Sequence, residues 1–307
     1  MNTLKANKDL IFQIKEEVYH FNSSIITPVV INNHPITNTT VSIVMTTSNR
    51  SKQTYYTLDT IKRSIYEDIH VIIVDDSTYD PIKKEVLETY PFYIDFITIN
   101  RANKKWHNPL VNYNIGFKYV KGCKVIIQNS EVCHVNDVST YIYNHTFDNN
   151  YYVMDVKASK SFETNEMIYS MDTKSITIFN NEELFSMWYQ HESNNRNYHF
   201  LTAMTRNTFE LVKNFSYDCT MGTCFDDDDF LLKIKSKGIN IVNLFNVPYG
   251  LGGIHLFHTN AIVTWDNGRE HNNHLFSNKL NVYNRTGHYV DVTENYNNFD
   301  IEYNKLV

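Results

Sequence analysis

The chain of 307 residues lacks the features that most directly mark nucleic-acid-binding, membrane-spanning and secreted proteins. Its net charge is −6 and its basic residues are scattered, so the sequence indicates neither nucleic acid nor an anionic membrane surface as a partner. No apolar run approaches the ~18–20 residues of a membrane span. The N-terminal stretch is interrupted by Asp9, Lys15 and Glu16, so it does not resemble a secretion signal. We therefore expect a cytoplasmic protein without a transmembrane segment.

Paired cysteines and glycine-rich phosphate loops are also missing. Cys123, Cys133, Cys219 and Cys224 show neither a C-x-x-C pair nor zinc-site spacing, and we expect them to be reduced thiols. The sequence contains no G-x-G-x-x-G and no G-x-x-x-x-G-K-[ST], which argues against a dinucleotide or P-loop cradle. A bound nucleotide would then need another way to neutralise its phosphates, such as a divalent cation held by carboxylates.

What is present is an alternation of strand-like and helix-like segments in the first half of the chain. Short β-branched apolar runs predict buried strands, and intervening segments have helical spacing. The strands are expected at 41–47, 70–77, 93–100 and 124–131, and the helices at 54–65, 81–90 and 108–120. This pattern predicts an α/β fold, with a mostly parallel, Rossmann-like central sheet and helices on both faces.

The remaining segments predict a main domain with two flanking pieces. We expect a helix at 8–20 and a connector up to residue 40, a main domain over 41–265, and a C-terminal tail over 266–307 packed on that domain. Within the main domain the pattern predicts a strand at 151–158, a strand and helix within 198–212, a helix ending near Gly238 and a strand at 239–245.

Ligands of such sheets bind beyond the carboxyl ends of the strands, so the residues after each apolar run are the candidates. Asp75 and Asp76 close the second strand, where a carboxylate can accept hydrogen bonds from a base or ribose, or can instead cap the next turn. Glu131 follows the fourth strand and is a candidate ligand for Mg²⁺ or Mn²⁺, with a solvated turn as the alternative. Asn129 can add an oxygen ligand or only a hydrogen bond.

Two further groups of side chains are candidates. His255 and His258 follow a flexible glycine pair and are candidate ligands of a metal or contacts of a phosphate; ordinary structural histidines are the alternative. Trp188 and His191 lie in a segment suited to a sugar-stacking wall in the acceptor site, with a core tryptophan as the alternative.

Four consecutive aspartates, Asp226 to Asp229, run into an apolar stripe that predicts a helix beginning near Asp227–Asp229. Aspartate is favoured at a helix N-cap and in the first turn. That explains one or two of the four, but adjacent anions raise one another's pKa, which suits a general base. We expect one or two to cap the helix and one to face a pocket and remove a proton from an acceptor hydroxyl.

Together these motifs resemble the nucleotide-sugar glycosyltransferases of GT-A fold, family 2 type, over roughly residues 40–260. The resemblance is carried by VSIVMTTSNR, VIIVDDS, the N-x-G of Asn114 and Gly116, the strand-end QNSE, and FDDDDFLLKIKSKG. It implies an inverting sugar transfer from a UDP, GDP or dTDP sugar to a glycan, lipid-linked or protein acceptor, with Mn²⁺ or Mg²⁺ as cofactor.

Carried over by position, the resemblance also implies roles for single residues. Asp75 reads the base with Asp76 beside it, and Asp227 is the catalytic base with Asp228 as the fallback. The rest of the nucleotide pocket is implied to comprise Thr46, Thr47, Asn49, Arg50 and Asn129. Asn129-Ser130-Glu131 stands where the family has its D-x-D metal motif, so Glu131 with His255 and His258 forms the expected metal site. The first aspartate of that motif is replaced here, which weakens the expected metal binding.

Two other functions compete with sugar transfer. A sugar-phosphate nucleotidyltransferase would need a glycine-bearing loop after the first strand, and TTSNRSKQ contains no glycine. A non-catalytic glycan-binding module would fit the replaced D-x-D motif, but the intact aspartate run argues against it. Turnover of a nucleotide sugar separates an enzyme from the binding module.

Overall fold

The computed structural model describes residues 28–99, 106, 108–171, 181–220, 222–245, 250–259 and 268–292. The helix expected at 8–20 lies outside these ranges. Among the described residues, no helix is both long and apolar enough to cross a membrane.

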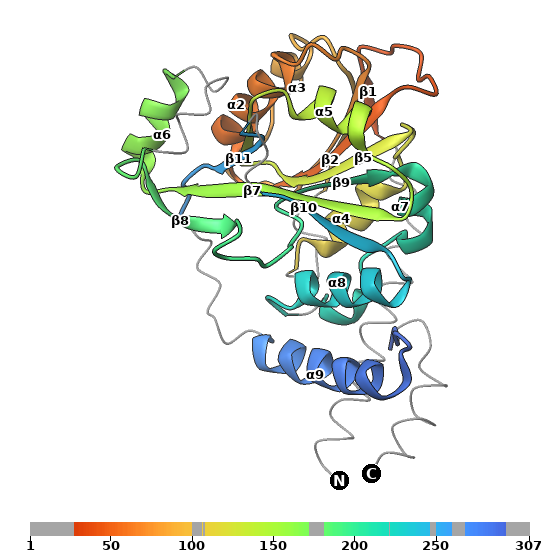
Figure 1. The fold of residues 1–307 in the computed structure, drawn as a ribbon. Coiled ribbons are helices and arrows are strands. Elements are labelled where there is room, and N and C mark those ends of the chain that lie inside the picture. Colours follow the sequence, from red (N-terminus) through yellow and green to blue (C-terminus); the bar gives the residue numbers. More distant parts are fainter. Residues whose placement is uncertain are drawn as a thin grey trace.

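A mixed sheet runs through the centre of the molecule (Figure 1). Its main path has the order β1-β4-β3-β2-β5-β9-β7-β11-β6, and β8 and β10 pair with β7. The neighbours β4, β3, β2 and β5 are parallel, as predicted, and β9 is antiparallel to both β5 and β7. The strands are β1 Val29–Ile31, β2 Val41–Thr47, β3 Ile69–Asp75, β4 Tyr93–Thr98, β5 Lys124–Asn129, β6 Val132–Val135, β7 Asn150–Ser159, β8 Phe185–Gln190, β9 Leu201–Thr205, β10 Asn240–Leu244 and β11 Gly252–His255.

Helices cover both faces of this sheet (Figure 1). Side chains of α2, α3 and α5 share one apolar core with the sheet, while α4, α7 and α8 share the other. The described helices are α2 Ser51–Lys62, α3 Lys84–Leu87, α4 Leu110–Phe117, α5 Val138–His145, α6 Phe162–Tyr169, α7 Arg206–Val212, the 3₁₀ turn η3 Tyr217–Cys219, α8 Asp226–Ser236 and α9 Arg269–Thr286.

The β-branched runs explain why the sheet is buried on both faces. In β2, Val44 points into one core and Ile43 into the other, and in β3 Ile72 and Ile73 divide in the same way. Side chains of a strand alternate between the two faces, so a run that is apolar at every position is stable only where both faces are covered. The α/β fold class is therefore confirmed.

Two segments differ from their expected structure. The connector over 21–40 contains the short strand β1, which pairs antiparallel with β4. The helix expected at 81–90 is shortened to α3, which begins only after Lys83 because the backbone of Lys83 is extended (φ −94°, ψ 125°). The N–H groups before this point have side-chain partners: Ile82 donates to Asp75 Oδ2 at 2.8 Å and Lys83 to Tyr55 Oη at 2.7 Å.

Helix α4 lies close against the sheet at Gly116. A Cβ atom at this position would lie 2.9 Å from Val44 Cγ1 and 3.3 Å from Val74 Cγ2. Two residues earlier, Asn114 donates through Nδ2 to Phe215 O at 3.0 Å and accepts the Phe215 N–H at 2.8 Å. The N-x-G motif therefore has a packing role, since it sets the distance between α4, the sheet and the segment that follows α7.

We predict that Gly116→Val lowers the free energy of unfolding by about 2 kcal/mol, because the added methyl groups overpack a filled core. Urea denaturation of both proteins measures the change. Asn273→Val on the exposed face of α9 is the control and should change the free energy of unfolding much less. Equal stability of Gly116→Val and the native chain would show that α4 is not tightly packed at this point.

Candidate active site

The strand-end residues predicted from the sequence meet at one edge of the sheet. In the parallel register Thr47 pairs with Asp75 and Thr46 pairs with Asn129. Thr46, Thr47 and Asp75 are buried there. The carboxyl ends of β2, β3 and β5 thus bring these side chains together, because neighbouring parallel strands end at the same edge.

The loops that follow β2 and β3 are tied to each other by side-chain hydrogen bonds. Asn49 has a left-handed backbone (φ 56°), and its Oδ1 accepts the N–H groups of Thr78 and Tyr79 at 2.8 and 2.9 Å. Asp80 accepts the Ser51 N–H at 2.9 Å and the Ser51 hydroxyl at 2.6 Å. The side chain of Asn49 therefore braces the two loops that border the strand-end edge.

The two aspartates after β3 have different partners. Asp75 accepts the Ser77 N–H through Oδ1 and the Ile82 N–H through Oδ2, both at 2.8 Å, which is the arrangement described by the capping alternative. Asp76 accepts from Asn112 Nδ2 at 3.0 Å and is 1% exposed. Burial raises the pKa of Asp75, although hydrogen bonds from Ser77 and Ile82 oppose this rise.

Glu131 and the two histidines form a compact cluster although they are distant in sequence. Strand β11 pairs with β6, so His255 lies beside the start of β6, and the Leu256 N–H donates to Glu131 O at 2.9 Å. His255 Nε2 and His258 Nε2 lie 3.4 and 3.5 Å from Glu131 Oε1. One ligand atom from each of the three residues lies within 4.8 Å of the others.

The charge on Glu131 is stabilised by Arg50, which lies at the start of α2. Arg50 Nη1 is 2.6 Å from Glu131 Oε1, and Glu131 is 2% exposed. Burial alone would raise the pKa of Glu131, but Arg50 and the two histidines together hold it well below its usual value. Burial also lowers the pKa of His255, more than Glu131 raises it, which favours a neutral imidazole.

One carboxylate and two imidazoles fit a transition-metal ion such as Mn²⁺ better than Mg²⁺, which prefers oxygen ligands alone. An ionised carboxylate and a neutral imidazole are also the protonation states that bind metals. The guanidinium of Arg50 already contacts the oxygen that both histidines approach. A cation bound here would therefore either share the Glu131 carboxylate with the Arg50 guanidinium or displace the guanidinium from that carboxylate.

The four aspartates occupy the first turn of α8, which begins at Asp226. The N-cap position is Phe225, with a left-handed backbone (φ 68°) and no side-chain cap. The expectation that aspartate side chains cap this helix is therefore wrong. The negative charge still lies at the favourable end of the helix dipole, but each carboxylate contacts a partner from another part of the chain.

The partners of Asp226, Asp228 and Asp229 come from different segments. Asp226 accepts from Asn108 Nδ2 at 3.1 Å, and Asp228 accepts from the Tyr198 hydroxyl at 2.7 Å. Asp229 is paired with Lys279 Nζ at 2.6 Å and accepts from the Tyr289 hydroxyl at 2.7 Å. Burial raises the pKa of all three carboxyl groups, and burial together with Asp227 raises the pKa of Asp226 to about 6.

Asp227 is paired with His199, which lies in the turn just before β9. His199 Nδ1 lies 2.6 Å from Asp227 Oδ1, and the His199 N–H donates to the same oxygen at 3.4 Å. The side chain of His199 is 7% exposed, whereas that of Asp227 is 25% exposed. Burial alone would lower the pKa of His199, but Asp227 and Asp226 outweigh burial and raise it. Asp227 is thus a partly exposed carboxylate held by a buried imidazole.

Tyr113 of α4 connects this pair to the strand-end edge. Its hydroxyl donates to Asn129 Oδ1 at 3.1 Å and to Gln128 O at 2.8 Å, and its ring packs edge-on against His199 at 5.1 Å. The Asn129 N–H also donates to Phe200 O at 3.3 Å. The Asp227–His199 pair therefore lies next to Asn129, so the aspartate run and the D-x-D position belong to one site.

The predicted acceptor residues lie beside each other on and after β8. The rings of Trp188 and His191 stack with centroids 4.2 Å apart, and Lys157 Nζ lies 4.6 Å from the Trp188 ring centre. The Trp188 ring is thus already in contact with an imidazole and an ammonium group. A sugar stacked on this ring would have to share it with these contacts.

Sequence reasoning missed His199, Tyr198 and Asn108 as partners of the aspartates. No motif marks these residues, and only the register of β9 and the position of the segment before α4 bring them to α8. Tyr198 and His199 lie inside the segment expected to form a strand. The only available signal was that Tyr198 and His199 form a polar pair next to a strand that borders the site.

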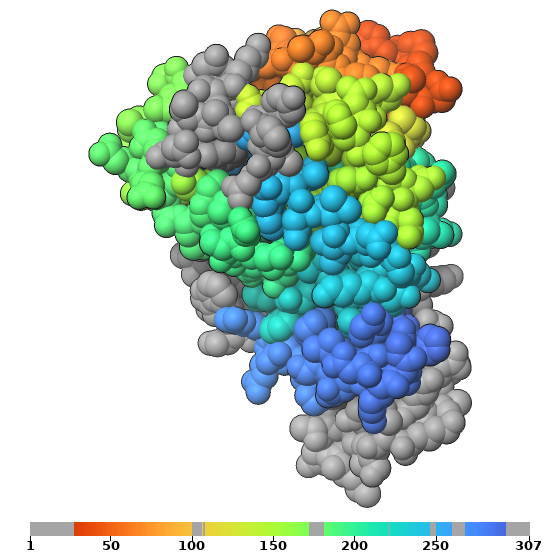
Figure 2. Space-filling view, in the orientation of Figure 1, coloured from red at the N-terminus to blue at the C-terminus, as the bar shows by residue number. Residues whose placement is uncertain are grey.

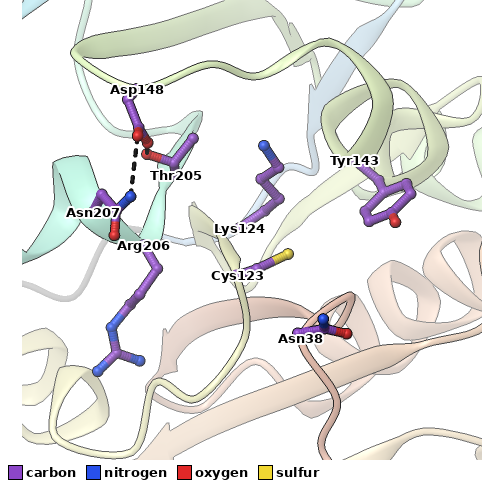
Figure 3. A pocket seen from close by; sticks show the side chains of 8 residues that line it. All are labelled: Asn38, Cys123, Lys124, Tyr143, Asp148, Thr205, Arg206 and Asn207. Atoms are coloured by element: carbon purple, nitrogen blue, oxygen red, sulfur yellow. Dashed lines mark hydrogen bonds between the residues drawn. The ribbon is translucent and has the colours of Figure 1, made fainter.

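A surface cavity of about 430 Å³ lies at the amino end of β5, and neither the aspartate run nor the Glu131–His255–His258 cluster lines it (Figure 3). Its charged groups pair locally: Asp148 accepts from Thr205 and from Asn207 Nδ2, and Lys124 donates to Thr146 O. The cavity is therefore not the candidate active site. The lining residues are Asn38, Cys123, Lys124, Tyr143, Asp148, Thr205, Arg206 and Asn207.

Comparison with known proteins gives a family match that includes the strand-end residues and Glu131 and ends before the aspartate run and the two histidines. The model described as glycosyl transferase family 2 matches residues 42–223. No curated protein matches the sequence.

Similar solved structures include a 1–349 fragment of S. aureus TarS, with 14% identity and a TM-score of 0.48 over 71% of this chain. The match spans 60% of that TarS chain. TarS with UDP-GlcNAc has 14% identity and a TM-score of 0.49, with 80% and 73% of the two chains covered. A Pyrobaculum calidifontis mannosyltransferase with GDP-Man and Mn²⁺ has 13% identity and a TM-score of 0.43, with 84% and 68% covered.

The raised pKa of Asp226 predicts a pH-dependent effect of Asp226→Asn on stability. The native state holds a proton on Asp226 more tightly than the unfolded chain does, so this group loses its favourable contribution as the pH rises from 3.8 to about 6. Above that range, the native chain carries a buried ionised carboxylate, which Asn avoids while still accepting from Asn108.

Asp226→Asn should therefore be more stable than the native chain at pH 7.5, by up to about 3 kcal/mol at 1.36 kcal/mol per pKa unit. The difference should vanish near pH 4. Urea denaturation at the two pH values measures it. A difference that does not change with pH would show that Asp226 titrates like an exposed carboxyl group.

Proposed function

The chain belongs to glycosyltransferase family 2 and is an enzyme, and from this premise we propose the reaction that it performs. It transfers a sugar from a nucleoside-diphosphate sugar to a hydroxyl group of an acceptor, with inversion at the anomeric carbon. Asp227 is the general base. Membership of this enzyme family argues against the binding-module alternative, which lacks turnover of a nucleotide sugar.

The observation that carries this proposal is the 2.6 Å contact between Asp227 and His199 next to Asn129. A general base must be accessible and ionised. Asp226 and Asp229 are 9% and 2% exposed, and Asp229 is paired with Lys279. Asp228 is partly exposed and accepts the Tyr198 hydroxyl. Asp227 combines exposure with a buried imidazole that fixes its carboxylate, which favours Asp227 over Asp228 as the base.

The donor occupies the carboxyl edge of β2, β3 and β5 in this proposal. Thr46, Thr47, Asn49 and Asp76 border the nucleoside, with Asp75 shaping the loop that receives the base. Arg50 is a basic side chain at this edge and lies next to Glu131. A guanidinium has donors suited to phosphate oxygens, so Arg50 is placed to meet the diphosphate of a UDP, GDP or dTDP sugar.

The transfer itself requires one proton acceptor and one leaving group. The carboxylate of Asp227 takes the proton of the acceptor hydroxyl as the hydroxyl oxygen forms a bond to the anomeric carbon. On the opposite side of that carbon, the bond to the diphosphate oxygen breaks and the nucleoside diphosphate leaves with its electron pair. His199 holds the Asp227 carboxylate in place for this step.

Glu131, His255 and His258 would hold a divalent cation, and Mn²⁺ suits their mixed oxygen and nitrogen ligands. When bound, such a cation stabilises the negative charge that develops on the diphosphate. Arg50 also offers positive charge at the same place.

The acceptor approaches from the side of Asp227, Trp188 and His191 in the proposed arrangement. Asp228 and Tyr198 lie next to Asp227 and offer a carboxylate and a hydroxyl for contacts with acceptor hydroxyls. A glycan, a lipid-linked sugar and a protein side chain all present such hydroxyl groups.

We predict that Asp227→Asn lowers the turnover number about 10²–10⁴-fold, because the carboxamide cannot accept the proton. Binding of the nucleoside diphosphate should stay within about twofold, since Asp227 does not contact it. Release of nucleoside diphosphate from UDP-, GDP- and dTDP-sugars measures turnover, and calorimetry measures binding.

Asp228→Asn is the matched control, and it should retain more activity than Asp227→Asn. Transfer by Asp227→Asn at the rate of the native chain would contradict the assignment. A larger loss in Asp228→Asn would move the base to Asp228.

A further inference from the structure

Helix α9 lies against α8 and against the segment that leads into it (Figure 2). The turn between η3 and α8 includes Gly222 to Phe225, and Phe225 has a left-handed backbone. The conformation of this turn sets the orientation of the first turn of α8, which holds the four aspartates. The contacts of α9 with this turn therefore bear on the position of Asp227.

The first of these contacts is made by Asn272, which is fully buried. Its Nδ2 group lies 3.3 Å from Cys219 O, 3.3 Å from Thr223 O and 3.1 Å from Cys224 O. A Cβ atom at Gly222 would lie 2.4 Å from Gly268 O, so the two backbones touch at this point. One amide side chain of α9 thus serves the carbonyl groups of the turn before α8.

The second contact is made by Lys279, seven residues further along the same helix face. Its side chain is 1% exposed, and Nζ lies 2.6 Å from Asp229 Oδ1 and 2.7 Å from Asp218 Oδ2. The Tyr289 hydroxyl joins the group, since it accepts from Lys279 Nζ at 3.0 Å and donates to Asp229 Oδ2 at 2.7 Å. Between these two contacts, the ring of Phe276 stacks on that of Phe225, with centroids 5.9 Å apart.

The buried charges at Lys279 depend on one another. Two carboxylates from different elements, Asp218 of η3 and Asp229 of α8, share one ammonium group. Burial alone would lower the pKa of Lys279, but the surrounding carboxylates raise it well above its usual value. Without this cation both carboxylates would be buried beside each other with unbalanced charge, and mutual repulsion would push α8 away from η3.

From these contacts we propose that α9 is a positioning element of the active site. Asn272 holds the turn before α8, and Lys279 holds Asp229 at the end of the aspartate run. Asp227 lies between these two points, so both contacts fix its position. This inference rests on the proposed role of Asp227 as the base. Lys279 touches no substrate in this account and acts only through α8.

The experiment compares the full-length native chain with Lys279→Met, which removes the charge and keeps a long, unbranched side chain. Hydrogen–deuterium exchange followed by mass spectrometry should show at least tenfold faster exchange over 222–230, with the strands of the sheet unchanged. Turnover, measured as release of nucleoside diphosphate from the UDP-, GDP- or dTDP-sugar that the native chain uses, should fall at least tenfold. The KM for that donor should stay within twofold.

A second substitution that restores part of the charge balance should rescue turnover in Lys279→Met. Adding Asp229→Asn to Lys279→Met removes one of the unbalanced carboxylates and should recover at least threefold in turnover, although Asp229→Asn alone lowers it. Lys235→Met on the exposed side of α8 is the matched control and should change neither exchange nor turnover. If Lys279→Met does not fold, Tyr289→Phe tests the proposal in its place. Loss of the Tyr289 hydroxyl should speed hydrogen–deuterium exchange over 222–230 about threefold.

Unchanged exchange over 222–230 in the folded variant, or a loss of turnover that appears only as a raised donor KM, would overturn the proposal. Exchange does not depend on which residue is the base. If Asp227→Asn kept its full rate while Lys279→Met still loosened 222–230 and lowered turnover, the positioning role of α9 would stand and the assignment of the base would fail.

Discussion

The constraint on which the active site depends is that four adjacent carboxylates cannot be placed in one partly buried helical turn unless each has a partner. The chain meets this constraint with Asn108, the adjacent pair Tyr198 and His199, and Lys279, which come from three different segments. Each partner fixes α8 to another part of the molecule. The position of the proposed base is therefore a consequence of how the aspartates on either side of it are paired.

The fold was largely predictable from the sequence. The middle positions of β2, β3 and β5 are apolar residues that point alternately into both cores, and only a sheet covered on both faces satisfies them. Once the strands were parallel, the residues at their carboxyl ends had to meet, which is why Thr47, Asp75 and Asn129 were found at one edge. The family match over 42–223 agrees with this reading.

The contacts that join distant segments of the site were only partly predictable. The resemblance implied a metal site of Glu131, His255 and His258, but no local pattern encodes the pairing of β11 with β6 that brings His255 to Glu131. His199 and Lys279 carry no motif, and a buried lysine cannot be told from an exposed one by its neighbours in sequence. The capping expected for the aspartates failed for the same reason: dipole and cap rules describe an isolated helix, whereas α8 is surrounded by partners from elsewhere.

The central claim is that the strand-end edge beside Glu131 binds a nucleoside diphosphate. Thermal unfolding of the native chain and of Glu131→Gln with UDP, GDP, dTDP and CMP, each with and without Mn²⁺, tests it most directly, because a ligand that binds only the native state raises the unfolding temperature. The account predicts stabilisation of the native chain by one of the three nucleoside diphosphates, larger with Mn²⁺, and loss of the Mn²⁺ dependence in Glu131→Gln. No stabilisation by any nucleotide, with or without Mn²⁺, would contradict it.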